Sequence, residues 1–355
     1  MKSKNLDIQL FKFLYACVIV IYHLAGSTAI ACPGGYYAVD YFLLTAGLFL
    51  FLTFEKNDGT DRQITPGAYL AKRFCRLLPW SITGFIAAVI VNRLFVERVT
   101  SVSYWINKFP SDFWEIVMAK GTGINAGALL INGPAWTISS MLIVGFLFWI
   151  LLFYYKKTFL NVVLPISLII GWGIWANLPS ANTEGWIGFT TFGTFRTWIV
   201  FGVSYYCMVL GKKLSTINFT KYGEIALTMV ELLLHGIAFY FIFEHAQRPT
   251  QWLLIVAFML AISIAVSGHS YIARLLSKLR IINFLGEVSI SIYLVHSPVM
   301  IVFRNVYNVK EWGWVQLLPL FGTVFVAAVI HYFGTNWLVR GFGYVKTKMA
   351  RVLID

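Results

Sequence analysis

Apolar segments of about 20 residues recur along almost the whole of this 355-residue chain, and they limit what it can fold into. A helix of that length spans the hydrocarbon core of a bilayer and satisfies its own backbone hydrogen bonds there. We therefore predict an all-α, polytopic transmembrane bundle of about ten helices. The expected spans are 8–27, 36–54, 77–96, 135–155, 158–178, 193–211, 222–244, 250–268, 284–303 and 315–338.

Charged side chains are scarce. Of the residues, 59% are hydrophobic and 12% are charged, whereas a soluble domain carries about 25% charged residues. This shortfall indicates that most of the surface faces lipid. No change of composition marks a second folded domain, so residues 1–355 are predicted to form one integral membrane domain. The first apolar run is expected to remain as a helix, because it is long and carries Lys12 and His23.

The basic residues predict an orientation. The net charge of +13 would indicate a nucleic-acid partner in a soluble protein. Here, however, most Lys and Arg residues gather in alternate short connections between the spans. If the N-terminus lies in the cytoplasm, the short inner connections are basic and the short outer ones are nearly neutral. This pattern predicts a multi-pass protein of the cell (plasma or inner) membrane with both termini in the cytoplasm and no nucleic-acid partner.

The longest connection, 97–134, is aromatic and amphipathic. It predicts a short helix that lies on the membrane or folds back into it. Its aromatic residues are Tyr104, Trp105, Phe109, Phe113 and Trp114.

The four cysteines are scattered and form no C-x-x-C pair. We interpret them as small core residues and predict neither a disulfide framework nor a metal site. They are Cys17, Cys32, Cys75 and Cys207.

Titratable groups inside hydrocarbon cost at least about 2.5–3.5 kcal/mol each, so they are candidates for function. Lys12 and His23 are eleven residues apart in the first span, so they share a helix face and differ in depth by about 16 Å. His23 is then expected in the outer half of the membrane. The alternatives are a rim anchor for Lys12 and a packing role for His23. Glu231 and His235, four residues apart, are expected to satisfy each other.

Three further groups are expected at a depth close to that of His23: Asp40, Arg196 and His296. A carboxylate such as that of Asp40 can hold an imidazole in one tautomer or stabilise the imidazolium. The alternative for Asp40 is a helix N-terminal cap. These groups predict an outer site with a histidine at its centre.

A second, basic set is expected on the cytoplasmic side. Arg73 and Arg76 are three residues apart and project from one helix face. Together with Lys12 they offer a fork for phosphate groups. The alternative is a simple positive-inside anchor. An inner phosphate site and an outer histidine site suggest group transfer across the membrane.

These residues resemble the motifs of the membrane-bound acyltransferase family 3, many of whose members O-acetylate cell-surface glycans. Lys12 and His23 are similar to its basic residue and histidine with ten residues between them. Four further segments are similar to the family's Asp-aromatic second helix, Arg-x-x-Arg motif, fourth-helix Trp and late Ser-x-Tyr-Leu-x-His sequence: 40–48, 73–79, 136–139 and 285–296.

The chain departs from that pattern at two positions. Lys12 stands where the family usually has Arg, which loses a bidentate fork. Met141 stands where many members have Glu, five residues after Trp136. The second departure is closer to the branch that includes the membrane domain of vancomycin-resistance serine racemases.

The resemblance implies an acyltransferase that transfers groups other than aminoacyl groups and needs no metal. Its donor would be acyl-CoA, in the first place acetyl-CoA, bound from the cytoplasm with its phosphates near Lys12, Arg73 and Arg76. His23 would act as general base or carry the acyl group briefly. Asp40 or His296 would orient it.

The resemblance also implies an acceptor, the hydroxyl of a surface glycan or a lipid-linked saccharide. It would enter from outside past Trp136, Ser139, Arg196 and Tyr293. The alternatives are that Trp136 is an ordinary interface anchor and that Ser139 bonds back to its own helix.

Two other functions remain open from the sequence. Ten helices with buried charge also fit a small-molecule transporter or flippase, although no internal repeat is evident. The racemase-like branch also fits a ligand-binding or sensing membrane module.

Overall fold

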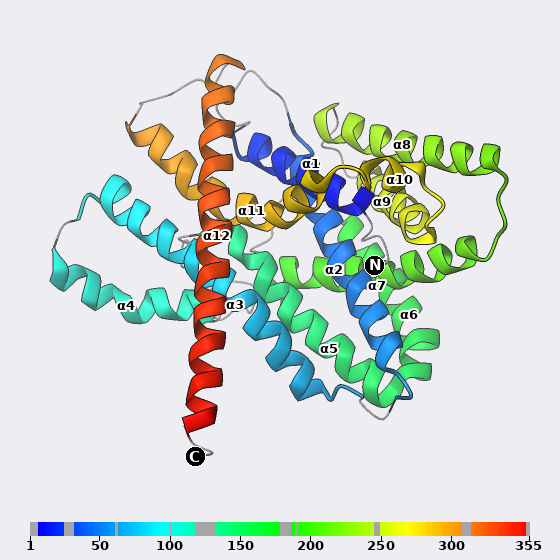
Figure 1. The fold of residues 1–355 in the computed structure, drawn as a ribbon, viewed down its shortest axis with the longest axis horizontal. Helices are drawn as coiled ribbons and strands as arrows, with labels where there is room; N and C mark the ends of the chain where they lie inside the picture. Colours follow the sequence, from blue (N-terminus) through cyan, green and yellow to red (C-terminus); the bar gives the residue numbers. More distant parts are fainter. Residues whose placement is uncertain are drawn as a thin grey trace.

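A computed structural model describes residues 6–24, 32–60, 63–99, 101–117, 132–177, 186–188, 190–244, 249–306 and 314–352. The described residues are almost all helical (Figure 1). Helices α1 (Leu6–Leu24) and α2 (Ala38–Asn57) are followed by the longer α3 (Pro66–Val91). The middle of the chain forms α4 (Val102–Val117), α5 (Trp136–Thr158), α6 (Leu164–Ala176) and α7 (Phe192–Ser215). The last third forms α8 (Lys221–Glu244), α9 (Pro249–Ser267), α10 (Tyr271–Leu276), α11 (Arg280–Val306) and α12 (Trp314–Val352).

Short elements lie beside these helices. A 3₁₀ turn precedes α2 at Gly35–Tyr37 and another precedes α5 at Gly133–Ala135. Wide π-type turns extend α3 at Asn92–Val96 and join α5 to α6 at Phe159–Val163. A two-residue hairpin, β1 (Trp186–Ile187) with β2 (Thr190–Thr191), leads into α7. The sequence reasoning predicted no strand there.

Seven helical stretches of the described chain are long and apolar enough to cross a membrane. This length and composition establish an all-α membrane protein, as predicted. Helical structure lies within each of the ten expected spans, but the number of crossings and the side of each terminus stay predictions. The seven stretches are Leu6–Leu24, Gly35–Asn57, Pro66–Val96, Gly133–Ala176, Lys221–Glu244, Ile281–Val306 and Leu317–Gly341.

Two helices run beyond their expected spans. Helix α3 begins at Pro66, where Thr65 caps the helix by accepting a hydrogen bond from the Ala68 amide. Helix α12 has 39 residues, about 58 Å at 1.5 Å per residue, which exceeds the roughly 30 Å core of a bilayer. In Figure 1 it runs the height of the molecule past α3 and α11.

The helices of the site are held by two apolar clusters. The larger one joins α1, α2, α5, α7 and α9, with Tyr15, Tyr41, Phe148 and Phe201 fully buried. The smaller one joins α1, α11 and α12. Helix α1 belongs to both clusters and lies between α2 on one side and α11 on the other. Its polar side chains are therefore fixed against two different neighbours.

The long connection forms a helix, as predicted. Helix α4 lies at one edge of the molecule, opposite α8 (Figure 1). Val102, Ile106 and Phe109 are exposed on it. The side chains of Phe113 and Trp114, and residues 118–131, lie outside the described part, and the position of α4 relative to a membrane stays a prediction.

Candidate active site

Two histidines from opposite ends of the chain lie side by side. His23 is in the last turn of α1, and His296 is in the middle of α11. Their ring centroids are 5.0 Å apart and their planes are inclined by 33°. The helices approach closely because Gly286 has no side chain: a Cβ there would lie 2.9 Å from the Cα of Gln9. The structure thus joins two groups that the sequence placed at one depth.

His296 has a defined hydrogen-bonding pattern. Its Nδ1 lies 3.2 Å from the carbonyl oxygen of Ile292, one turn earlier. A carbonyl only accepts, so Nδ1 donates, and in the neutral ring Nε2 keeps a free lone pair. That Nε2 is buried and has no hydrogen-bond partner within the described structure. His296 is fully buried, whereas His23 is exposed.

Asp40 lies opposite Arg196. Nε and Nη2 of Arg196 donate to the two carboxylate oxygens at 2.8 and 2.7 Å, and Nη2 also donates to the Tyr36 carbonyl. The arginine side chain is 1% exposed and the aspartate side chain 0%. The structure therefore pairs Asp40 with Arg196, whereas the sequence offered it as a possible partner of an imidazole or as a helix cap.

Aromatic rings enclose the rest of the Arg196 guanidinium. Its Cζ lies 5.5 Å from the ring centroids of Tyr36 and Trp175 and 5.9 Å from that of Tyr37. Such rings stabilise a cation. The N-cap of α7, Thr191, accepts from the Thr194 amide and fixes the helix start just before Arg196. This arrangement makes Arg196 an interior support of the contact between α7 and α2.

The other expected acceptor residues lie around the same helices. Tyr293 is buried one turn before His296, with 6.0 Å between the ring centroids, and its hydroxyl lies beside Thr137. Trp136 is half-buried at the start of α5. The Ser139 hydroxyl donates to the Trp136 carbonyl at 3.1 Å, which is the back-bonding alternative.

The inner basic residues lie near α1 and α3 but do not meet at one point. Arg73 is half-buried, and its Nη1 donates to the Tyr69 hydroxyl at 2.8 Å. Its guanidinium also faces the Phe201 ring at 5.9 Å. Arg76 is exposed and interacts electrostatically with Lys12. Arg76 and Lys12 are therefore the pair best placed to hold a phosphate group.

The part of the chain that the structure describes contains no group of three or more His, Cys, Asp and Glu side chains arranged to bind a metal ion.

A family model described as an acyltransferase domain matches residues 5–333. The chain belongs to this family, acyltransferase family 3. The match begins before α1 and ends within α12, so it includes both histidines and the inner basic residues. The protein is therefore a membrane acyltransferase. No curated protein and no solved structure matched.

Sequence reasoning missed Arg304 as a member of the acyltransferase site. Its Nη2 donates to the carbonyl oxygen of His23 at 3.3 Å. Arg304 is exposed and lies eight residues after His296 on α11, so both residues fall on one side of that helix. The spacing of eight residues between His296 and Arg304 was the sequence signal that could have identified Arg304. Arg304 ties the end of α1 to α11 and adds a positive charge beside His23.

His331 was also missed. Its Nδ1 lies 2.9 Å from the Ser291 hydroxyl, and its Nε2 lies 2.8 Å from the Thr83 hydroxyl. One side chain of α12 thereby joins α3 and α11 in the acyltransferase. The position of His331 inside an apolar span was the sequence signal that could have identified it. The hydrogen bonds make it a support for α11, which carries His296.

The expected pair of Glu231 and His235 is not formed. Glu231 accepts from the Ser270 hydroxyl, and Nδ1 of His235 lies 2.9 Å from the Tyr15 hydroxyl. The prediction was wrong because residues four apart on a helix also face neighbouring helices. Here α1 and the start of α10 offer nearer partners.

Proposed function

We propose that this acyltransferase moves an acyl group, in the first place acetyl, from cytoplasmic acyl-CoA to a hydroxyl of an extracytoplasmic or lipid-linked glycan. The proposal rests on the paired rings of His23 and His296. An exposed imidazole beside a buried, unpartnered nitrogen is an arrangement suited to proton transfer. It occurs where α1 and α11 meet, in the region that the sequence predicts to be the outer half of the membrane.

The reaction follows from the roles of the two rings. One nitrogen of His23 takes the proton of the acceptor hydroxyl as the oxygen attacks the thioester carbon. The carbon–sulfur bond breaks, an ester bond forms, and the proton passes to the departing CoA thiolate. During the reaction the unpartnered Nε2 of His296 would accept a hydrogen bond from the other nitrogen of His23, which would leave the first nitrogen free to act as base. A brief acyl-imidazole on His23 is the covalent variant of the same step.

The donor would bind on the basic side. Arg76 is exposed and Lys12 lies near it, so the two cations can contact the phosphates of CoA. Arg73 is already bonded to Tyr69 and faces Phe201, so its main part would be to hold α3 against α5 and α7. The acceptor would approach from the side of Trp136 and Tyr293.

The test compares surface glycans from cells with the wild-type protein, no protein, and His23→Ala. We expect a mass difference of one acyl group between the wild type and both other strains. His269→Ala serves as the matched histidine control, because the His269 ring interacts with Glu224 at the start of α8. Each variant is checked for normal amount in the membrane.

Other results would favour the alternatives. A transporter would move its substrate without consuming acyl-CoA, and a sensor would bind a ligand without turnover. Full acylation by a normally inserted His23→Ala protein would refute the role of His23.

A further inference from the structure

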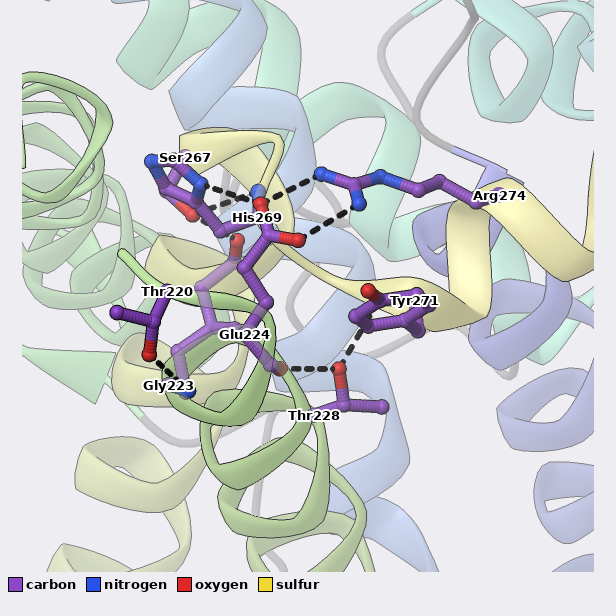
Figure 2. A network of polar contacts seen from close by, with 9 residues as sticks. Thr220, Gly223, Glu224, Thr228, Ser267, His269, Tyr271 and Arg274 are labelled. Carbon is purple, nitrogen blue, oxygen red and sulfur yellow. Dashed lines mark hydrogen bonds and ion pairs between the residues drawn. The ribbon is translucent and has the colours of Figure 1, made fainter. Parts of the chain in front are cut away.

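One face of α8 carries four polar side chains at intervals of three or four residues: Glu224, Thr228, Glu231 and His235. At its exposed end, Glu224 accepts from both terminal nitrogens of Arg274 at 2.7 Å and interacts with Nδ1 of His269 at 3.1 Å. Figure 2 shows this network, in which the Thr228 hydroxyl also accepts from the Tyr271 amide. The carboxylate of Glu224 thus has a cationic partner in Arg274.

Two turns further along α8, Glu231 lies in a different environment. It is 0% exposed, one oxygen accepts from the Ser270 hydroxyl at 2.5 Å, and the other, Oε1, has no partner. Asp7, at the start of α1, is also 0% exposed. Its Oδ1 accepts from the Ile8 amide, and its Oδ2 has no partner. Asp7 and Glu231 are near enough to interact electrostatically.

No cation in the described part of the chain pairs with these two carboxyl groups. Lys12, one turn after Asp7, interacts with Arg76 and Glu287 instead. The other titratable groups around the pair are two tyrosines, a cysteine and a histidine, and Nδ1 of the histidine lies beside a tyrosine hydroxyl. They come from α1, α2, α7 and α8: Tyr15, Tyr41, Cys207 and His235.

Two buried negative charges without a counter-ion would be strongly unfavourable, because each loses its hydration and repels the other. The charge must therefore be removed by a bound cation or by a proton. Asp7, Glu231 and Ser270 together offer five side-chain oxygens, and one oxygen of each carboxyl group already accepts a hydrogen bond, whereas Ca²⁺ takes six to eight oxygen ligands and Mg²⁺ demands an octahedron. A proton needs only one of the unpartnered carboxylate oxygens.

We propose that Asp7 and Glu231 form a buried proton-binding site, which holds at least one proton at neutral pH. The site is separate from the histidine pair. It nevertheless lies on α1, the helix that carries His23, so gain or loss of this proton changes the packing of that helix against α8. The polar face of α8 leads from the site to Glu224, whose partner Arg274 is exposed, and it gives the proton a route to water.

The test is infrared spectroscopy of the full chain in detergent at neutral pH. A protonated carboxyl group gives a carbonyl band separate from those of carboxylates, and the band shifts in heavy water. We expect this band in the wild type and its weakening or loss in Glu231→Gln and Asp7→Asn. Glu224→Gln is the matched control on the same helix, and it should leave the band unchanged because Glu224 is ionised beside Arg274.

Stability provides an independent measurement. If the folded protein holds a proton that the unfolded chain releases at neutral pH, the free energy of unfolding falls as the pH rises. Glu231→Gln should reduce that slope while the protein stays folded, because Gln imitates the neutral carboxyl group. Absence of the band in the wild type, or its persistence in both variants, would overturn the proposal. A wild type without the band whose stability rises with Na⁺, Ca²⁺ or Mg²⁺ would assign the site to a metal cation instead.

Discussion

Arg196 and Asp40 form a two-point ion pair across 156 residues of sequence, and neither side chain is more than 1% exposed. The pair joins α7 to α2 inside the bundle. Desolvation of both charges is offset by two hydrogen bonds and by three aromatic rings around the guanidinium. The pair therefore supports the fold only as long as both members are present.

Loss of one member should be costly. We expect Arg196→Leu to lower the free energy of unfolding by about 3–5 kcal/mol, because it leaves the Asp40 carboxylate buried without a partner. Unfolding titrations in mixed detergent measure this change. The double variant with Asp40→Leu should recover much of the loss. Lys212→Ala breaks the exposed pair with Glu55 and should cost about 0–1 kcal/mol. If Arg196→Leu and Lys212→Ala lowered the free energy of unfolding equally, the role assigned to the buried Arg196–Asp40 pair would be contradicted.

Removal of the His296 imidazole should lower turnover without unfolding the protein. We expect His296→Ala to reduce kcat by up to about 100-fold, the lower end of the range for a proton-transfer partner. The KM for acyl-CoA should stay unchanged, and the pH profile of kcat should shift because His23 loses its neighbour. Acyl transfer from labelled acyl-CoA in membrane vesicles gives these quantities. A purely structural histidine would leave the pH profile in place.

The inner basic residues are expected to affect only the binding of the acyl-CoA donor. Arg76→Ala is expected to raise the KM for acyl-CoA by about 10- to 100-fold, which corresponds to one lost charged hydrogen bond. The matched measurement uses an acyl-pantetheine donor, which lacks the nucleotide phosphates. Its KM should not change. An equal effect on both donors would show that Arg76 does not contact phosphate.

Close contact between α1 and α11 depends on Gly286. A Cβ there would come within 2.9 Å of the Cα of Gln9, so Gly286→Ala must push the helices apart. We expect a loss of about 1–3 kcal/mol of stability, together with lower activity because His23 and His296 separate. Gly322→Ala on α12 meets no atom within 4 Å and should be neutral or slightly stabilising in a helix. Thermal unfolding and the vesicle assay compare the two variants.

Both termini should face the cytoplasm. Reporter proteins fused at either end, one active only inside the cell and one only outside, measure this directly. We expect both fusions to report the inside. A split result would mean an odd number of crossings and would reverse the depths assigned to the site residues.

Hydropathy alone located the helices well, because the thickness of the bilayer dictates how long an apolar span must be. It missed the early start of α3 at Pro66 and the late end of α12 at Val352, since those turns leave the apolar region and carry polar side chains. The hairpin before α7 is too short to give a pattern of its own.

The sequence predicted how deep each site residue lies along its helix. It did not predict which neighbouring helix each side chain faces. Spacing along α1 and α11 put His23 and His296 at one level, and the structure pairs them. The same argument offered Asp40 as a possible partner of His23 and Glu231 as a partner of His235. In the structure Asp40 lies with Arg196 and Glu231 lies with Ser270. Which neighbour a side chain meets depends on how each helix turns toward the others, and one sequence does not contain that angle. The sequence reasoning did not assign His331 and Arg304 to the site for the same reason.

The contact between α1 and α11 has a consequence for synthesis of the protein. The ribosome makes His23 near the beginning, yet its partner ring arrives only when α11 has been inserted, after more than 250 intervening residues. Until α11 is inserted, the face of α1 that later packs against it is exposed to lipid and to the translocation machinery. A chain that stops before residue 280 would keep His23 but lack His296. The two rings can therefore meet only after translation has run nearly to completion.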